Sequence, residues 1–250
     1  MTGPSVLGVF AHPDDESLSA GGLLARASAG GARTTVVTAT WARDSVRGPE
    51  LAEALRILGA GEPRMLGYAD ALVPESAPGR PRFLDAPLDE VVERLVAHMR
   101  EFRPDVVVTH DAYGGMTGHQ DHRHTYRVTV LAAEAAGLEQ LYPEAGEPWQ
   151  PSDLYLATHP DSVVPALRSA IGARRAVYSV PDEQVTDRLD VTPWLEEKVA
   201  AVLAHRSEVE RGAVPGLVAA LPPESRGAML ATEWYIRRGL GPSTTAETGL

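Results

Sequence analysis

The stretch VLGVFAHPDDE, residues 6–16, decides the fold of this chain of 250 residues. Its first six residues form a short, continuous apolar run, which is typical of a strand buried on both faces of a parallel sheet. Pro13 disfavours a helical conformation at His12, so the chain must turn directly after the strand. The turn carries one imidazole and three carboxylates within five residues. The sequence therefore predicts a buried strand that presents a polar cluster at its carboxyl end.

Segments with strand character alternate with segments of helical character along the rest of the chain. This alternation predicts an α/β fold with a Rossmann-like, mostly parallel sheet and helices on both faces. In such a sheet, ligands bind beyond the carboxyl ends of the strands. Besides the strand at residues 6–11, we expect strands at 34–40, 64–66, 105–110, 154–158 and 176–180, and helices at 17–29, 49–58, 88–102, 119–136, 192–210 and 225–238.

The composition limits the classes of function that are open to the chain. The formal net charge is -11, from 34 acidic and 23 basic residues, and such a surface repels nucleic-acid backbones. No apolar run reaches the roughly 18 residues that a membrane-spanning helix needs, and no signal-peptide pattern opens the chain. There is no cysteine, so a metal site must use His, Asp or Glu. We expect a cytoplasmic protein without nucleic-acid partners or membrane spans, which could form a homo-oligomer.

The length fits one large α/β domain, so we expect residues 1–250 to form a single domain. Within it, residues 1–140 carry the alternating strands and helices of a Rossmann-like catalytic core. We expect residues 141–250 to complete the sheet and the substrate pocket.

A second polar cluster follows the strand expected at residues 105–110. Four of the eight histidines of the chain fall between positions 110 and 124. A catalytic zinc needs three protein ligands and an open position for water, and His and Asp side chains supply such ligands. The ends of adjacent strands would bring the two clusters together and leave a carboxylate free to act as a base. The second cluster consists of His110, Asp111, His119, Asp121, His122 and His124.

The segments AHPDDE (residues 11–16) and GHQDH (residues 118–122), with Gly21-Gly22 after the first, resemble the PIG-L/LmbE-like family of zinc-dependent N-acetylglucosaminyl deacetylases. The first motif matches the family pattern fully, and in the second Gln120 stands where the family usually has proline. The resemblance implies an LmbE-like fold and a zinc cofactor. It also implies that the metal ligands are His12, Asp15 and His122, that Asp14 is the general base, that His119 is the acid or oxyanion partner, and that Asp121 orients a histidine.

Two weaker matches concern substrate binding. Arg47 with Glu50 resembles an Arg-x-x-Glu segment, and Asp70 resembles a family position that contacts the sugar. Both are most similar to the branch that deacetylates glucosaminyl-inositol in the mycothiol pathway. Thr117, however, stands where that branch has a tyrosine beside the catalytic histidine, so the resemblance does not fix the substrate.

We therefore expect a hydrolase that removes an N-acetyl group from an amino sugar or a glycosylated small metabolite, using a zinc-bound water. Fe(II) or another divalent transition metal would suit the same ligands. Two alternatives stay open: a zinc amidase that cleaves a different acyl amide, and a non-enzymatic nucleotide-binding α/β module. The absence of a G-x-G-x-x-G segment after Phe10 disfavours the second. The sequence leaves open the roles of His110, Asp111, Arg43 and His205.

Overall fold

The computed structural model of this protein describes residues 3–171 and 177–241. The strands in these ranges are β1 (Val6–Phe10), β2 (Thr34–Thr40), β3 (Arg64–Tyr68), β4 (Val106–His110), β5 (Asp153–Thr158), β6 (Asp187–Asp190) and β7 (Thr232–Gly239). They form one sheet in the order β3-β2-β1-β4-β5-β7-β6. β1 to β5 are parallel, whereas β7 is antiparallel to both β5 and β6. The predicted α/β fold with a mostly parallel sheet is confirmed.

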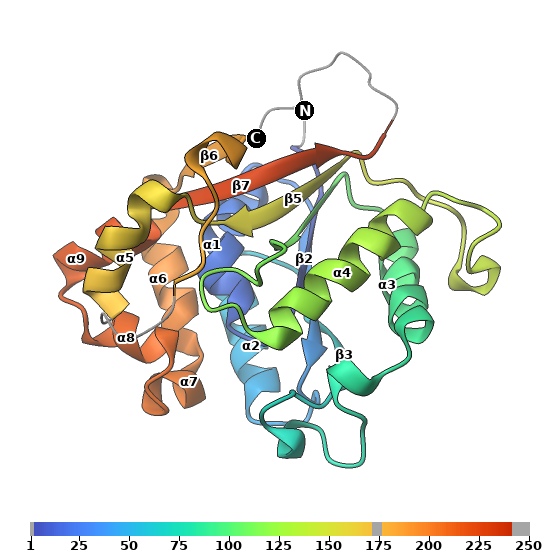
Figure 1. Ribbon diagram of the computed structural model, residues 1–250, viewed down its shortest axis with the longest axis horizontal. Helices are drawn as coiled ribbons and strands as arrows, with labels where there is room; N and C mark the ends of the chain where they lie inside the picture. Colours follow the sequence, from blue (N-terminus) through green and yellow to red (C-terminus); the bar gives the residue numbers. More distant parts are fainter. Residues whose placement is uncertain (1–2, 172–176, 242–250) are drawn as a thin grey trace.

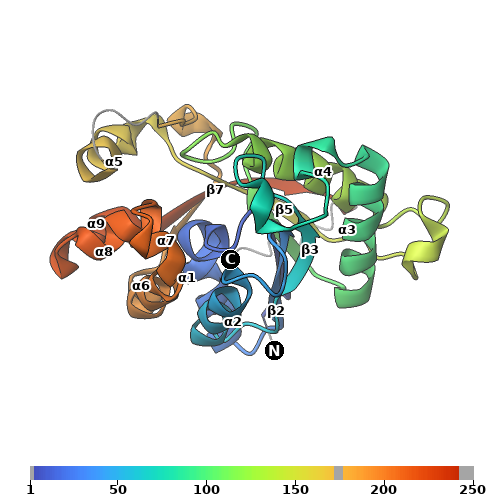
Figure 2. The same ribbon diagram turned by 90° about the horizontal axis from the view of Figure 1, so that it is seen from below.

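Helices cover both faces of the sheet, as Figures 1 and 2 show. One face carries α3 (Leu88–Phe102) and α4 (Gln120–Ala135), and the other carries α1 (Asp15–Ala29), α2 (Arg47–Ile57) and α6 (Leu195–Ala204). Shorter helices lie beside α6 and one another: α5 (Val164–Ile171), α7 (Arg206–Glu210), α8 (Val214–Ala220) and α9 (Pro223–Leu230). None of the helices in the described ranges is long and apolar enough to cross a membrane.

Short 3₁₀ segments connect these elements. They lie at Pro74–Ser76, Phe83–Asp85, Pro143–Ala145, Asp161–Val163, Asp182–Gln184 and Thr192–Trp194.

Apolar burial holds the two helical layers to the sheet. All five residues of β1 are buried, as expected for a strand covered on both faces. In α3 the apolar residues recur at helical spacing, so Val92, Leu95 and Met99 all face the sheet and are at most 2% exposed. Each such side chain contributes about 1.5–3 kcal/mol by leaving water. The helix ends at Phe102, and Arg103 caps it in a left-handed conformation with φ of 56°.

The glycine pair after the first motif allows α1 to pack closely. A Cβ atom at Gly22 would lie 2.3 Å from Cγ1 of Val191, which is too close for any side chain. Val191 lies just before the segment that leads into α6. Gly22 therefore permits the approach between α1 and the chain entering α6.

The sheet order places the ends of β1 and β4 side by side. β1 pairs with β2 on one side and with β4 on the other, although β2 and β3 come between β1 and β4 in the sequence. The strand order therefore reverses at the boundary between β1 and β4, and ligands of open α/β sheets bind at such reversals. His12 follows β1 and Asp111 follows β4, so both polar clusters lie at this boundary.

The helix predicted at residues 225–238 is confirmed only up to Leu230, and its second half is wrong. Helix α9 ends at Leu230, and residues 232–239 form β7. Glu233 and Tyr235 are buried while Trp234 is half-buried, which is the alternation of a strand. Aromatic and β-branched side chains also favour a strand in this segment. The error arose because the apolar residues of a short segment can fit both the helical repeat of about 3.6 residues and the strand repeat of two residues.

Other boundaries also differ from the sequence-based expectation. The helix predicted at residues 192–210 is divided at His205 between α6 and α7, and the sequence did not predict β6. The strand predicted at residues 176–180 is reduced, in the described part, to one bridge between Pro160 and Val180. Ala176 itself lies outside the described residues.

Candidate metal centre

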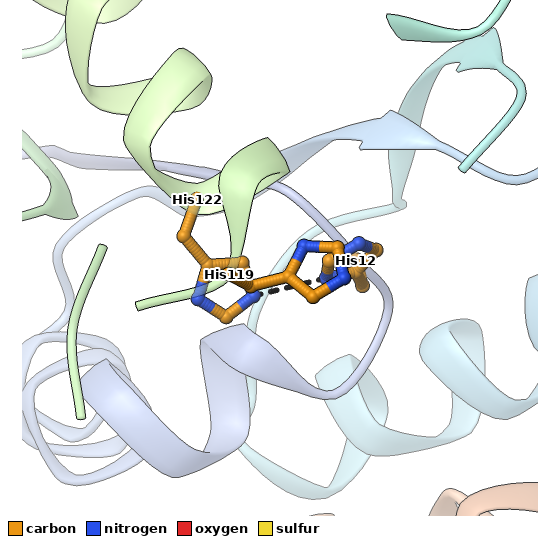
Figure 3. Close-up of side chains that lie close together, drawn as sticks. All are labelled: His12, His119 and His122. Carbon is orange, nitrogen blue, oxygen red and sulfur yellow. Dashed lines mark hydrogen bonds between the residues drawn. The ribbon is translucent and has the colours of Figure 1, made fainter. Parts of the chain in front are cut away.

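Side chains of three residues from the two polar clusters converge at the adjacent ends of β1 and β4. Nδ1 of His12 lies 3.0 Å from Nε2 of His122 and 3.2 Å from Oδ2 of Asp15, and Nε2 of His122 lies 3.2 Å from Oδ1 of Asp15. Figure 3 shows His12 and His122 pointing toward each other, with His119 beside them. Around a tetrahedral zinc with bonds of about 2.0–2.1 Å, ligand atoms are separated by roughly 3.3 Å. The three side chains therefore have the separations of ligands to one divalent metal.

The other hydrogen bonds of the two rings leave a lone pair on each for a metal. Nδ1 of His122 lies 3.0 Å from the carbonyl oxygen of Gly114. Because a carbonyl only accepts, Nδ1 donates and Nε2 stays unprotonated. Nε2 of His12 lies 3.1 Å from Oδ2 of Asp70 and 3.3 Å from Oδ2 of Asp121. Donation to these carboxylates leaves Nδ1 of His12 for a metal, so the donor set fits a divalent cation.

Without a metal, the charges at this cluster shift two pKa values. Burial would raise the pKa of Asp15, but electrostatic interaction with the neighbouring imidazoles of His122 and His110 holds it well below its usual range. Burial would lower the pKa of His12, but hydrogen bonds to surrounding carboxylates, that of Asp121 first, hold it well above its usual range. A metal that binds His12 must therefore displace a proton, so its affinity falls as the pH falls.

Asp14 lies beside the cluster in a backbone conformation that is rare for an L-residue. Its φ is 127° and its ψ is -30°. Its carboxylate makes no capping hydrogen bond to α1 and lines the pocket that opens onto the cluster. Burial, and then the negative charge of Asp15, raise the pKa of Asp14 to about 6. A carboxylate with such a pKa can accept and return a proton near neutral pH.

His119 caps the first turn of α4. Its Nδ1 accepts the backbone N–H of Asp121 at 3.2 Å, so Nε2 carries the proton. Burial, and then the neighbouring imidazoles of His12 and His122, lower the pKa of His119 to about 4. At neutral pH the ring is therefore uncharged, and a neutral imidazole at a helix N-terminus can donate to a developing oxyanion. Of the two roles implied for His119, this geometry favours the oxyanion partner.

Two residues whose roles the sequence left open support the cluster from the end of β4. The ring of His110 stacks on that of His122, with centroids 4.1 Å apart and planes within 8°. Nε2 of His110 accepts the N–H of Ala11 at 3.3 Å, which ties β4 to the end of β1. Asp111 accepts two backbone N–H groups of the loop before α4 and, at 2.6 Å, the hydroxyl of Thr158. His110 and Asp111 therefore hold the segment that carries His122.

A pocket of about 450 Å³ opens onto the cluster and is lined by both residues predicted to contact substrate. Asp70 directs one carboxylate oxygen to His12, 3.1 Å away. Arg47 is only 3% exposed, donates to the carbonyl of Pro13 at 3.3 Å and forms an ion pair with Glu208. Both side chains thus have partners within the chain, and their contact with substrate stays a prediction. Arg43, by contrast, is exposed.

Glu16 and His205 form a buried pair that the sequence did not reveal. Nε2 of His205 lies 2.8 Å from Oε1 of Glu16, and both residues are 0% exposed. Burial would raise the pKa of Glu16, but the charge of His205 lowers it; Glu16 in turn raises the pKa of His205 against the effect of burial. The two residues are 189 positions apart, so no local pattern connects them. The one sequence signal for His205 is the short His-x-Ser segment that begins at this residue.

Comparison with known proteins places both motifs in one family. Residues 7–133 match the PIG-L family, described as GlcNAc-PI de-N-acetylase. A protein of Streptomyces avermitilis named 1D-myo-inositol 2-acetamido-2-deoxy-alpha-D-glucopyranoside deacetylase is 38% identical, and the match covers 91% of this chain and 89% of the relative. A protein with the same name from Rhodococcus jostii is 36% identical, with 94% and 92% covered.

A solved structure has the same fold. N,N'-diacetylchitobiose deacetylase from Pyrococcus horikoshii, solved in complex with an inhibitor, superposes with a TM-score of 0.65 over 94% of this chain and 84% of that chain. The sequences are 21% identical. At that level of identity the likeness shows a shared architecture and leaves the chemistry to be argued from the site.

Proposed function

Because this chain belongs to the PIG-L family of de-N-acetylases, we propose that it hydrolyses the N-acetyl group of an amino sugar, with a divalent metal held by His12, Asp15 and His122. The observation that carries this proposal is the convergence of Nδ1 of His12, Nε2 of His122 and the Asp15 carboxylate, whose two oxygens each lie 3.2 Å from one of the two nitrogens, while the nitrogens lie 3.0 Å apart. The curated relatives are named as deacetylases of an acetamido-glucopyranoside joined to inositol. A glucosaminyl-inositol is therefore the first substrate to test.

We assign zinc as the metal because two imidazoles and one carboxylate match its usual catalytic ligands. A metal in this position would lower the pKa of a bound water to about 7 and polarise the amide carbonyl. Fe(II) suits the same donors, so metal analysis must decide between them. The side chains of Asp121 and Asp70 would hold His12 in the tautomer that binds metal.

The other residues of the site would move protons and stabilise charge. Asp14 takes the proton of the attacking water and later gives it to the amine nitrogen as the C–N bond breaks, so that the free amine and acetic acid, which ionises to acetate, leave. His119 donates its Nε2–H to the oxyanion that forms from the carbonyl oxygen. Arg47 and Asp70, which line the same pocket, are proposed to contact the sugar.

One observation keeps a second substrate class in view. Besides polar residues, the lining of the pocket includes the apolar side chains of Leu167, Val214 and Met229. These side chains could receive an acyl chain longer than acetyl. The alternative is therefore a metal-dependent amidase for longer acyl amides, which would use the same proton transfers.

A substrate panel tests the proposal. The metal-loaded protein is incubated with N-acetylated amino sugars, including N-acetylglucosaminyl-inositol, and with the same amines carrying longer acyl groups. We expect equal amounts of acetate and free amine, the latter detected by mass. Preferential release of a longer acid would favour the amidase, and tight binding of a nicotinamide dinucleotide with no hydrolysis would revive the nucleotide-binding alternative. Single-domain organisation of residues 1–250, homo-oligomerisation and the cytoplasmic location stay predictions.

A further inference from the structure

The backbone of Asp14 needs support from its surroundings. A φ of 127° is rarely adopted by a residue with a side chain, and such conformations persist only where neighbouring groups hold them. The carbonyl of Asp14 accepts the N–H of Leu18 at 3.2 Å, which fixes only the side of the residue that leads into α1. Its carboxylate makes no capping hydrogen bond. The N–H side of Asp14 must therefore be held by another group.

Glu16 accepts the N–H of the peptide that enters Asp14, and His205 holds Glu16. Arg47 donates to the carbonyl on the other side of the same peptide, that of Pro13, at 3.3 Å. Oε2 of Glu16 accepts the N–H of Asp14 at 2.9 Å. Oε1 of Glu16 accepts the hydroxyl of Ser17 at 2.6 Å and lies 2.8 Å from Nε2 of His205. Within the described residues, Nδ1 of His205 has no hydrogen-bond partner. The contact with Glu16 is therefore the hydrogen bond through which this ring acts.

The chain after His205 contacts the same region through two further pairs. Ser207 donates its N–H and its hydroxyl to the Glu50 carboxylate, at 2.8 and 2.6 Å. Glu208 forms the buried ion pair with Arg47. The Ser207–Glu50 pair joins α7 to α2 rather than to the turn at residues 12–16. It thus provides a matched control for the His205–Glu16 pair.

We propose that the buried Glu16–His205 pair positions Asp14 for catalysis: His205 fixes the Glu16 carboxylate, and Glu16 fixes the strained backbone that directs the Asp14 carboxylate into the pocket. This inference rests on the proposed function, because it takes Asp14 to be the base. Neither Glu16 nor His205 is among the described residues that line the pocket. Both are therefore positioning residues, which act through Asp14.

Replacement of His205 tests whether this residue positions Asp14 or only holds α7 against the rest of the fold. His205→Met keeps the approximate volume and removes the donor, His205→Gln keeps a donor, and Ser207→Ala breaks the neighbouring contact. With an N-acetyl substrate that the wild type hydrolyses, we expect His205→Met to lower kcat about 100-fold, as for a misplaced catalytic group. KM and metal content should stay unchanged. His205→Gln should recover most of the loss, and Ser207→Ala should lower the unfolding temperature but not kcat.

A double-mutant cycle shows whether His205 acts through Asp14. In an Asp14→Asn background, adding His205→Met should cause no further loss of kcat, while the losses of thermal stability still add. If the two losses of kcat multiply, His205 acts independently of Asp14 and the proposal is wrong. It is also wrong if His205→Met loses no more kcat than Ser207→Ala.

Two further outcomes are decisive. If His205→Met does not fold, Glu16→Asp makes the same test, because it keeps the charge but withdraws the carboxylate from the N–H of Asp14. Wild-type turnover by Glu16→Asp would then overturn the proposal. If Asp14→Asn alone keeps full turnover, the assignment of the base in the proposed function fails, and the positioning role fails with it. Loss of turnover in Asp14→Asn with wild-type turnover in Glu16→Asp leaves the proposed function standing and removes only the positioning role.

Discussion

Replacing Asp14 should stabilise the metal-free protein while it lowers turnover by about 100- to 10,000-fold. Two costs meet at this residue: a φ of 127° and a buried charge next to Asp15. Asp14→Gly removes both costs, because glycine adopts positive φ without strain. Asp14→Asn removes the charge and keeps the strain. Comparison of the two variants therefore separates the two contributions to the free energy of unfolding.

The magnitudes follow from the structure. Raising the pKa of Asp14 from 3.8 to about 6 means that its ionisation costs the folded state roughly 3 kcal/mol at pH 8. The folded state binds the proton more tightly than the unfolded state, so this cost appears as the pH rises through the range between the two values. At pH 5 it falls to about 1.5 kcal/mol by the same linkage. In Asp14→Gly, relief of backbone strain adds about 1–3 kcal/mol to the free energy of unfolding. The greater entropy of glycine in the unfolded chain removes about 1 kcal/mol of this gain.

Urea unfolding of chelator-treated protein at pH 5 and pH 8 provides the assay. We expect Asp14→Asn to gain about 3 kcal/mol at pH 8 and about half of that at pH 5. Asp14→Gly should exceed Asp14→Asn by about 1 kcal/mol at both pH values. If Asp14→Gly is the less stable variant at both pH values, the strain is not real. If neither variant exceeds the wild type at pH 8, the charge of Asp14 is not costly.

Three further predictions concern other parts of the molecule. Zinc binding should release about one proton, because the pKa of His12 is held above its usual range; calorimetry in buffers of different ionisation enthalpy should detect this, and equal heats would contradict it. His119→Ala should lower kcat about 100- to 1000-fold with unchanged metal content, and loss of metal instead would make His119 a ligand. Lys198→Met should destabilise the fold by about 3–5 kcal/mol, because Lys198 is buried 2.6 Å from Glu233. The exposed ion pair of Arg56 is the control, since Arg56→Met should leave the unfolding midpoint unchanged.

The sequence predicts the inner part of the fold well, for physical reasons that are local. β1 and β4 are short apolar runs, which is the sequence pattern of strands that are covered on both faces of a parallel sheet. The two polar clusters follow those strands directly, so their meeting at one edge of the sheet follows from the parallel topology. α3 was equally clear because its apolar residues repeat at helical spacing over fifteen residues.

The C-terminal part is less predictable because it is defined by contacts with distant segments. The segment around Trp234 is too short for its period to be decisive, and it becomes a strand because β5 offers an antiparallel edge. No pattern near His205 indicates Glu16, and none near Arg47 indicates Glu208. Such partners become visible only when the chain is folded, and they show that Arg47, which the sequence predicts to contact substrate, is buried in an ion pair with Glu208.

The metal dependence of acetate release tests the central claim most directly. Protein stripped with a chelator is titrated with zinc, and acetate release from an N-acetylated amino sugar is followed for the wild type and for Asp15→Ala. We expect no release from the stripped wild type, full release at about one zinc per chain, and neither tight zinc binding nor release for Asp15→Ala. Undiminished acetate release by the stripped protein, or by Asp15→Ala, would contradict the assignment of the metal site to His12, Asp15 and His122.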